Sequence, residues 1–174
     1  MLEKIKDIQL ILFDVDGVFC DGNITYLDDG TELKTFNIQD GMGIKLAQMA
    51  GIKTGIITSR KSHALEKRAG ELKIDIVLQG AENKYQSYLK IKSELKLNDH
   101  QICYLGDDLL DLAILYKVGF AVSVANAREE VKAVSDYVTL NRGGDGALRE
   151  VIELILKKQK KFDTLIESFL SDLE

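Results

Sequence analysis

Aspartate residues cluster directly after two short apolar runs of this sequence. Asp14 and Asp16 lie in the segment FDVDGV, and Asp107, Asp108 and Asp111 lie in GDDLLD. We expect each apolar run to be a buried strand, so that the carboxylates stand where a strand leaves the sheet. Five carboxylates at neighbouring strand ends would repel one another unless a cation lay between them. Because Mg²⁺ prefers oxygen ligands, the pattern predicts a magnesium site made of carboxylates.

Each acidic group taken alone is more often a turn or a helix cap than a metal site. Their joint occurrence changes that balance, and two other features strengthen the case. Thr58 and Ser59 follow another apolar run, and Lys84 opens a predicted helix. A hydroxyl donor and a fixed cation beside a metal are what a transferring phosphoryl group requires. The residues therefore predict phosphoryl-transfer chemistry.

The elements that must position these side chains alternate along the chain. Apolar runs predict buried parallel strands at residues 10–13, 53–58, 76–78, 102–105 and 120–124. Amphipathic segments predict helices at 42–50, 62–72, 83–95, 109–118 and 128–133. Alternating strands and helices indicate an α/β fold with a doubly wound, mostly parallel (Rossmann-like) sheet.

One segment breaks this alternation. Residues 22–37 contain two β-prone arms around Asp29 and Gly30, which predicts a β-hairpin inserted after the first strand. The spacings between Asp14, Thr58 and Lys84 leave no room for a further inserted domain. We expect a single domain over residues 1–174. Residues 146–174 are helical in period and are expected to pack on the body or on a neighbouring subunit, and their last part, 157–174, forms a C-terminal helical tail.

Composition narrows the function classes. The chain has 174 residues, a formal net charge of −5 and no dense Lys/Arg stripe, which argues against nucleic acid as a partner. No apolar run reaches the roughly 18 residues that a membrane helix needs, and the first ten residues lack a signal-peptide core. We therefore expect a soluble, cytoplasmic protein. Cys20 and Cys103 form no CxxC pair and are expected to be small buried thiols.

The order DVDGV, ITSR, NK and GDDLLD over most of the chain resembles the haloacid dehalogenase superfamily of phosphatases with an aspartate nucleophile. This resemblance implies that Asp14 is the nucleophile and that Asp16 is the general acid and base. It further implies that Thr58 donates a hydrogen bond to the phosphoryl oxygens and that Lys84 neutralises charge on the nucleophile and the phosphoryl group.

The same resemblance implies a Mg²⁺ cofactor. Asp107 would complete the metal site, and Asp16 would bind the metal through its backbone carbonyl. Asp108 and Asp111 would support the site, either through metal-bound water or by orienting Lys84. The predicted metal ligands are Asp14, Asp16, Asp107 and Asp108.

Residues 10–154 are similar to capless phosphatases that act on 3-deoxy-D-manno-octulosonate 8-phosphate, with Ser59 where glycine is usual. The resemblance implies a homotetramer with central hairpins, and a substrate that is an acidic sugar phosphate of lipopolysaccharide biosynthesis. Nonulosonate 9-phosphates, on which close relatives act, are the alternative substrate. Arg60, Lys61 and Arg68 are candidates to bind the sugar carboxylate, although each could be an ordinary surface charge. The predicted substrate-binding residues are Thr58, Ser59, Arg60, Lys61, Arg68 and Lys84.

Two other classes remain as alternatives. A receiver-type signalling module also has clustered aspartates on a doubly wound sheet, but its phosphorylated aspartate follows the third strand. Here Gln79 and Gly80 occupy that place. A non-catalytic binding subunit would not need every catalytic position to be filled. Site order therefore favours the phosphatase.

Overall fold

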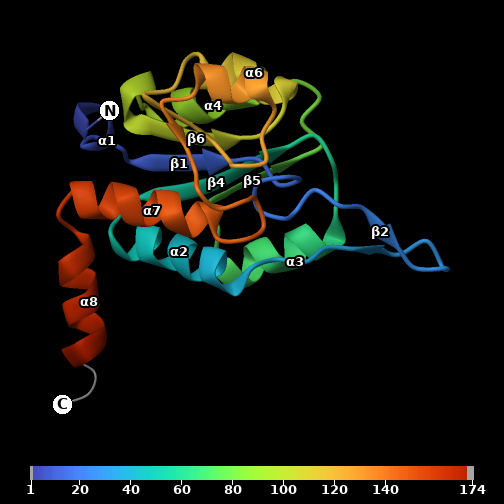
Figure 1. Ribbon diagram of the computed structural model, residues 1–174, viewed down its shortest axis with the longest axis horizontal. Helices are drawn as coiled ribbons and strands as arrows, with labels where there is room; N and C mark the ends of the chain where they lie inside the picture. Colours follow the sequence, from blue (N-terminus) through green and yellow to red (C-terminus); the bar gives the residue numbers. More distant parts are fainter. Residues whose placement is uncertain (1, 172–174) are drawn as a thin grey trace.

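The computed structural model describes residues 2–171 and contains a six-stranded sheet, covered by helices on both faces (Figure 1). The strands, in chain order, are β1 (Leu10–Phe13), β4 (Lys53–Thr58), β5 (Ile76–Gln79), β6 (Ile102–Gly106), β7 (Phe120–Ser123) and β8 (Tyr137–Val138). They are ordered β5-β4-β1-β6-β7-β8, and every neighbouring pair is parallel. The predicted α/β fold with a doubly wound sheet is confirmed.

Helices α2 (Ile38–Met49), α3 (His63–Leu72) and α7 (Ala147–Lys158) cover one face of the sheet. Helices α4 (Lys84–Leu95) and α6 (Glu129–Val134) cover the other, as Figure 1 shows. The remaining helices are α1 (Leu2–Ile5), α5 (Leu112–Leu115) and α8 (Phe162–Ser171).

Strand β1 lies in the middle of the sheet, between β4 and β6. All four of its side chains are fully buried, as expected for a strand covered on both faces. Phe13 is in register with Ile56 of β4 and Leu105 of β6, so the carboxyl ends of the three strands lie side by side. The residues that follow these ends therefore meet at one edge of the sheet.

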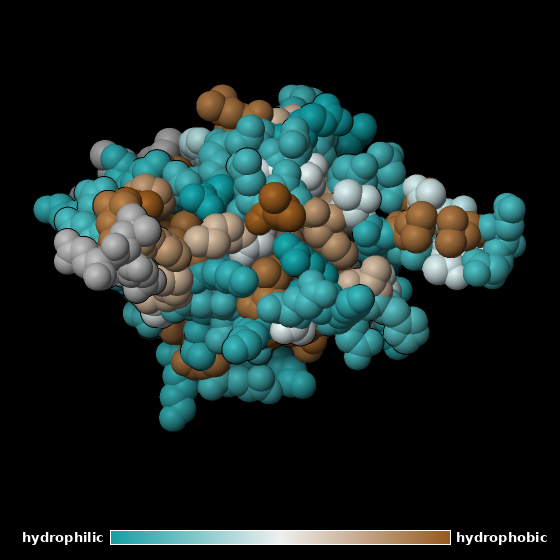
Figure 2. All heavy atoms as spheres, turned by 90° about the horizontal axis from the view of Figure 1, so that it is seen from below, coloured by the Kyte–Doolittle hydropathy of each residue, from teal (hydrophilic) through white to brown (hydrophobic). Residues whose placement is uncertain are grey.

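The inserted hairpin is present and projects from the body (Figure 1). Its strands are β2 (Thr25–Tyr26) and β3 (Glu32–Leu33), which pair antiparallel. The predicted turn is closed by Asp29, whose carboxylate accepts a hydrogen bond from the Thr31 amide at 2.8 Å. Apolar side chains of the hairpin are exposed, and they form part of the brown surface on the projecting arm in Figure 2.

Three features of the fold differ from the sequence-based prediction. The helix predicted at 109–118 is wrong in form, because a 3-10 turn at Leu109–Asp111 precedes the short α5. Asp108 caps that turn by accepting the Leu109 amide at 2.7 Å. Strand β8 and helix α1 were not predicted, since two and four residues are too short to show a period.

The C-terminal segment is helical, as predicted, but it breaks into α7 and α8. Lys160, between them, has the left-handed backbone conformation that ends a helix (φ 58°). Helix α7 packs on α2, whereas α8 extends away from the body (Figure 1). Residues 172–174 of the predicted tail lie outside the described residues. Among residues 2–171, no helix has the length and apolar character needed to span a membrane.

Candidate active site

A pocket of about 170 Å³ lies at the carboxyl ends of β1, β4 and β6. It is lined by Asp14, Asp16, Thr58, Ser59, Arg60, Lys84, Asp107, Asp108 and Leu110. The structure therefore brings together eight of the residues singled out from the sequence, although they are separated by up to 94 positions (14 to 108).

A buried lysine links two of the aspartates. The Lys84 ammonium lies 2.8 Å from Asp14 Oδ2 and 2.8 Å from Asp111 Oδ1. Asn83 fixes the start of α4 by accepting the Gln86 amide at 3.0 Å, so Lys84 is the first residue of a capped helix. The lysine is therefore held in place from both its backbone and its ammonium end.

Asp111 is fully buried and its hydrogen-bonding capacity is occupied. Besides Lys84, its Oδ1 accepts the Tyr104 hydroxyl at 2.7 Å. Its Oδ2 accepts the backbone amides of Asp107 at 3.0 Å and Asp108 at 3.3 Å. Asp111 thus orients Lys84 and closes the loop after β6, which is the second of the two supporting arrangements anticipated from the sequence.

The crowding of carboxylates perturbs their protonation. Burial, followed by the charge of Asp111, raises the pKa of Asp14 to about 6. Burial, followed by the charges of Asp14 and Asp111, raises the pKa of Asp107 to about 7. Burial acts to lower the pKa of Lys84, but the carboxylates of Asp111 and Asp14 outweigh it and the pKa is raised. Lys84 therefore stays charged, while two carboxylates lack sufficient positive charge around them.

These residues fit a divalent cation. Carboxylate oxygens of Asp14, Asp107 and Asp111 lie within 4.8 Å of one another. Asp107 Oδ1 is buried and, within the part of the chain that the structure describes, has no hydrogen-bond partner. Because Asp111 is occupied by its four donors, Asp14 and Asp107 are the pair that would hold the ion. An all-oxygen donor set suits Mg²⁺.

The other two predicted metal ligands are placed differently. Asp108 is exposed at the rim of the pocket, where it caps the 3-10 turn. The Asp16 carboxylate is ion-paired with Lys34, so a contact of Asp16 with the ion would use its backbone carbonyl. Both ligand roles stay predictions.

Mg²⁺ is expected to stabilise the protein more at about pH 8 than at about pH 5.5. The pKa values of Asp14 and Asp107 are raised in the folded chain to about 6 and about 7. Without metal, the stability that these two groups contribute is therefore present near pH 4 and is lost as the pH rises through 6 and 7. A bound cation reverses this loss because it replaces the protons. Thermal unfolding with Mg²⁺ and with chelator, at both pH values, measures the effect; an equal shift in melting temperature at both pH values would contradict it.

Gly17 is expected to be intolerant of substitution. Its φ is +91°, and a Cβ built there would overlap the Asp107 carboxylate. Gly17→Ala should therefore displace Asp107 and weaken Mg²⁺ binding by at least about tenfold. Gly30→Ala is the matched control, because Gly30 has a similar φ of +84° but a Cβ there has no neighbour within 4 Å. Isothermal titration calorimetry with Mg²⁺ compares the two variants. Equal Mg²⁺ affinities would show that the close approach of Gly17 to Asp107 is unimportant.

Two hairpin residues contact residues that line the pocket, although the sequence alone did not link them to the site. Lys34 forms an ion pair with Asp16, and Glu32 forms one with Arg60. The signal in the sequence was the alternation in TELK, which puts Glu32 and Lys34 on one face of the hairpin arm and Leu33 on the other. It could be used only with the orientation of the hairpin known.

The predicted substrate-binding residues at and after the end of β4 do not all face the pocket. Thr58 is buried, and its hydroxyl accepts the Arg60 amide at 3.4 Å. Lys61 lies outside the pocket, in a separate hollow with Gln79. Arg68 also lies outside it and is paired with Glu71 on α3 at 3.2 Å. Within this subunit, Arg60 is thus the predicted carboxylate-binding residue that reaches the site.

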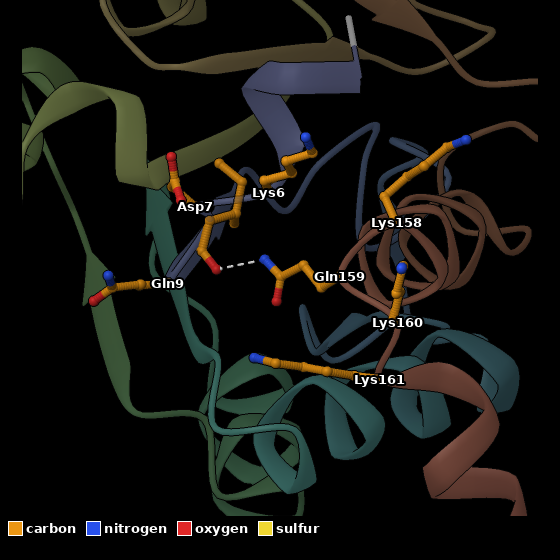
Figure 3. A pocket seen from close by; sticks show the side chains of 8 residues that line it. Lys6, Asp7, Gln9, Lys158, Gln159, Lys160 and Lys161 are labelled. Carbon is orange, nitrogen blue, oxygen red and sulfur yellow. Dashed lines mark hydrogen bonds between the residues drawn. The ribbon is translucent and has the colours of Figure 1, made fainter.

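A second hollow, of about 480 Å³, lies at the opposite end of β1 and is shown in Figure 3. It is formed by the segments 6–9 and 158–161, which Gln159 joins by donating to the Ile8 carbonyl at 2.9 Å. Four lysines and a single carboxylate, that of Asp7, line it. It has neither a carboxylate pair nor a hydroxyl, so the residues suited to phosphoryl transfer are those at the carboxyl edge.

Comparison with known proteins identifies the family of this chain. A model of the haloacid dehalogenase-like hydrolase family matches residues 75–151. The 3-deoxy-D-manno-octulosonate 8-phosphate phosphatase KdsC of Escherichia coli K12 is 40% identical over 163 residues, which cover 94% of this chain and 87% of that protein. The enzyme of the same name from Yersinia pestis is 39% identical over 163 residues, which again cover 94% of this chain and 87% of that protein.

Solved structures from the same family are also similar to this chain over most of its length. A structure of 3-deoxy-D-manno-octulosonate 8-phosphate phosphatase from Moraxella catarrhalis, in complex with magnesium, phosphate and KDO, has a TM-score of 0.94. It is 43% identical and covers 97% of both chains. The cobalt-bound form of the Haemophilus influenzae phosphatase has a TM-score of 0.87 at 34% identity, over 91% of this chain and 92% of that one. This chain therefore belongs to the 3-deoxy-D-manno-octulosonate 8-phosphate phosphatase family of haloacid dehalogenase-like hydrolases, which act on phosphate monoesters.

Proposed function

We propose that this chain is a magnesium-dependent phosphatase that hydrolyses 3-deoxy-D-manno-octulosonate 8-phosphate through a phosphoryl group carried on Asp14. The observation that carries the proposal is the buried Asp14 carboxylate, which lies 2.8 Å from Lys84 and beside Asp107 at the base of the pocket. The identity to phosphatases named for this substrate, over 94% of the chain, supports the choice of sugar.

In the first step, a carboxylate oxygen of Asp14 attacks phosphorus, the new O–P bond forms, and the bond from phosphorus to the sugar oxygen breaks. Asp16 gives its proton to the leaving oxygen. Lys84 and the Thr58 hydroxyl bind the phosphoryl oxygens as charge shifts toward the leaving group. Mg²⁺, when bound, supplies positive charge that offsets the repulsion between an anionic nucleophile and an anionic substrate.

In the second step, water attacks the phosphoryl group on Asp14. Asp16, now ionised, accepts a proton from that water, inorganic phosphate leaves, and the Asp14 carboxylate is restored. Both steps use one acid-base group in its two protonation states. The two steps therefore need no residue outside the pocket.

The sugar carboxylate is assigned to Arg60. Its guanidinium lies at the pocket and already binds a carboxylate, that of Glu32. A bidentate guanidinium suits this group. The proposed substrate thus presents its phosphate to the aspartates and its carboxylate to the mouth of the pocket.

The test is phosphate release from a panel that contains octulosonate 8-phosphate, a nonulosonate 9-phosphate and a neutral hexose 6-phosphate, with Mg²⁺ and with chelator. Magnesium-dependent release that favours octulosonate 8-phosphate is expected. A preference for the nonulosonate 9-phosphate would change the assigned substrate, and no phosphate release from any compound would overturn the proposed activity.

We further propose a homotetramer assembled through the hairpins. Ile24, Tyr26, Leu27 and Leu33 expose between 46% and 62% of their surface on one projecting arm, which is a large apolar area for a free loop. Leu33→Lys is expected to convert the tetramer to smaller species in sedimentation velocity. Leu140→Lys, at a residue 88% exposed outside the hairpin, is the control. A wild-type monomer would contradict the assembly.

A further inference from the structure

Lys34 is an almost completely buried lysine that contacts Asp16, one of the residues that line the pocket. Its side chain is 2% exposed, although it follows an exposed hairpin strand. Its ammonium is ion-paired with Asp16 Oδ1, and Glu32 Oε1 lies 3.3 Å from it. Burying a lysine is costly unless its charge is matched, so both carboxylates are needed to keep it there.

The same hairpin arm also holds Arg60. Glu32 Oε2 is ion-paired with the Arg60 guanidinium, and Arg60 Nε lies 3.9 Å from Asp16 Oδ2. Asp16 is thus approached on one oxygen by Lys34 and on the other side by Arg60, which lines the pocket. The two oxygens of Asp16 have different surroundings.

We propose that Lys34 is a positioning residue that fixes the Asp16 carboxyl group for proton transfer. Lys34 has only donor hydrogens, so Oδ1 must act as the acceptor whether Asp16 is ionised or protonated. The transferable proton is then carried by Oδ2, the oxygen on the side of Arg60 and the pocket. This inference rests on the proposed role of Asp16 as acid and base.

The position of Lys34 gives the hairpin a role inside its own subunit. Strand β3 directs Glu32 inward to Arg60 and Lys34, while the next residue, Leu33, faces outward. A hairpin used only for assembly would not need buried charges on its inner side. The inner face therefore serves the site, independently of what the outer face contacts.

The test uses substrates that differ in their need for a proton. A sugar phosphate releases an alkoxide, which must be protonated, whereas p-nitrophenyl phosphate releases a stable phenolate. The ratio kcat/KM reports the steps up to release of the leaving group, so it isolates the acid role of Asp16. Lys34→Met, Lys34→Arg, Asp16→Asn and the control Lys67→Met, an exposed lysine on α3, are compared on octulosonate 8-phosphate and p-nitrophenyl phosphate.

Lys34→Met is expected to lower kcat/KM for the sugar phosphate by about 100-fold and for p-nitrophenyl phosphate by less than about fivefold. Asp16→Asn should show the same selectivity. Lys34→Arg should retain most of the activity that Lys34→Met loses, and Lys67→Met should lose no activity on either substrate. Circular dichroism checks that each variant is folded; if Lys34→Met is not, Lys34→Arg and Lys34→Gln carry the comparison.

Two results would overturn the inference, and they are distinguishable. In the first, Asp16→Asn lowers kcat/KM for the sugar phosphate selectively, but the Lys34 variants lower kcat/KM equally for both substrates or for neither. Lys34 then does not position Asp16, and the proposed function stands. If Asp16→Asn itself shows no selectivity, the acid assignment fails, and the role of Lys34 fails with it.

Discussion

Asp14→Asn is expected to abolish turnover, with a loss of at least about 10⁴-fold in kcat, because the proposed mechanism carries the phosphoryl group on the Asp14 carboxylate and an asparagine amide is a far weaker nucleophile. Asp14 is 7% exposed, directly follows the central strand β1 and lines the pocket. Lys84, its ion-pair partner, is a cation and cannot attack phosphorus. Phosphate release from octulosonate 8-phosphate with Mg²⁺ measures the loss.

The stability of the same variant separates lost chemistry from lost structure. Burial and Asp111 raise the pKa of Asp14, so its ionised form is unfavourable in the metal-free fold. An asparagine keeps the shape and removes that charge, while its amide can donate toward Asp107 Oδ1, which lacks a partner. The melting temperature in chelator should therefore be unchanged or higher, and the gain from Mg²⁺ should shrink.

Asp108→Asn is the matched control for Asp14→Asn. Asp108 lines the same pocket but is exposed and caps a turn, a role that asparagine also fills. If Asp108 acts only as this cap, Asp108→Asn should retain most activity. Substantial turnover by Asp14→Asn would remove Asp14 as the nucleophile, and a loss in Asp108→Asn as large as in Asp14→Asn would give Asp108 a direct role with the metal.

Much of the fold could be predicted because its strands are buried on both faces. Residues 10–13 are uniformly apolar, and the structure buries every one of them in β1. Such a run is typical of a strand in the interior of a parallel sheet. Once β1, β4 and β6 are neighbours, the aspartates that follow β1 and β6 meet without further information.

Local polar contacts explain where sequence reasoning was wrong or incomplete. The apolar residues after Asp108 favoured a long helix, but Asp111 turns its carboxylate back to the amides of Asp107 and Asp108 and tightens the first turn. Lys61 was grouped with Arg60 because they are adjacent, yet they face different hollows. Adjacency along a loop does not define direction.

The role of Lys34 shows a different limit. It is 18 residues from Asp16, and its ammonium reaches that carboxylate only because the returning arm of the hairpin passes beside the end of β1. A charge in an exposed arm is, from sequence alone, an ordinary surface charge. Contacts made by an inserted element depend on its orientation, which neither periodicity nor motif spacing describes.

Lys84→Met is expected to lower activity by about 10³-fold, since it removes a fixed cation from the transferring phosphoryl group. Methionine fills similar volume, so the change is mainly one of charge. Lys90→Met, on the exposed face of the same helix with a Glu94 contact at 4.0 Å, is the control and should keep its activity. Retention of activity by Lys84→Met would show that Mg²⁺ alone neutralises the phosphoryl group.

The stability of Lys84→Met should depend on pH in a direction that identifies the cause. Without the ammonium, Asp14 and Asp111 remain as buried charges, and removal of one partner from a buried ion pair costs about 3 kcal/mol. Asp111 keeps Tyr104 and two amides as donors, so Asp14 carries most of the penalty. The pKa of Asp14 is already raised to about 6 with Lys84 present, and removal of the Lys84 ammonium raises that pKa further. As the pH falls, Asp14 becomes protonated and the cost of burying its charge disappears. Denaturant unfolding in chelator should therefore show a large deficit at about pH 8 and a smaller one at about pH 5. An equal deficit at both pH values would mean that Lys84 acts by packing and not by charge.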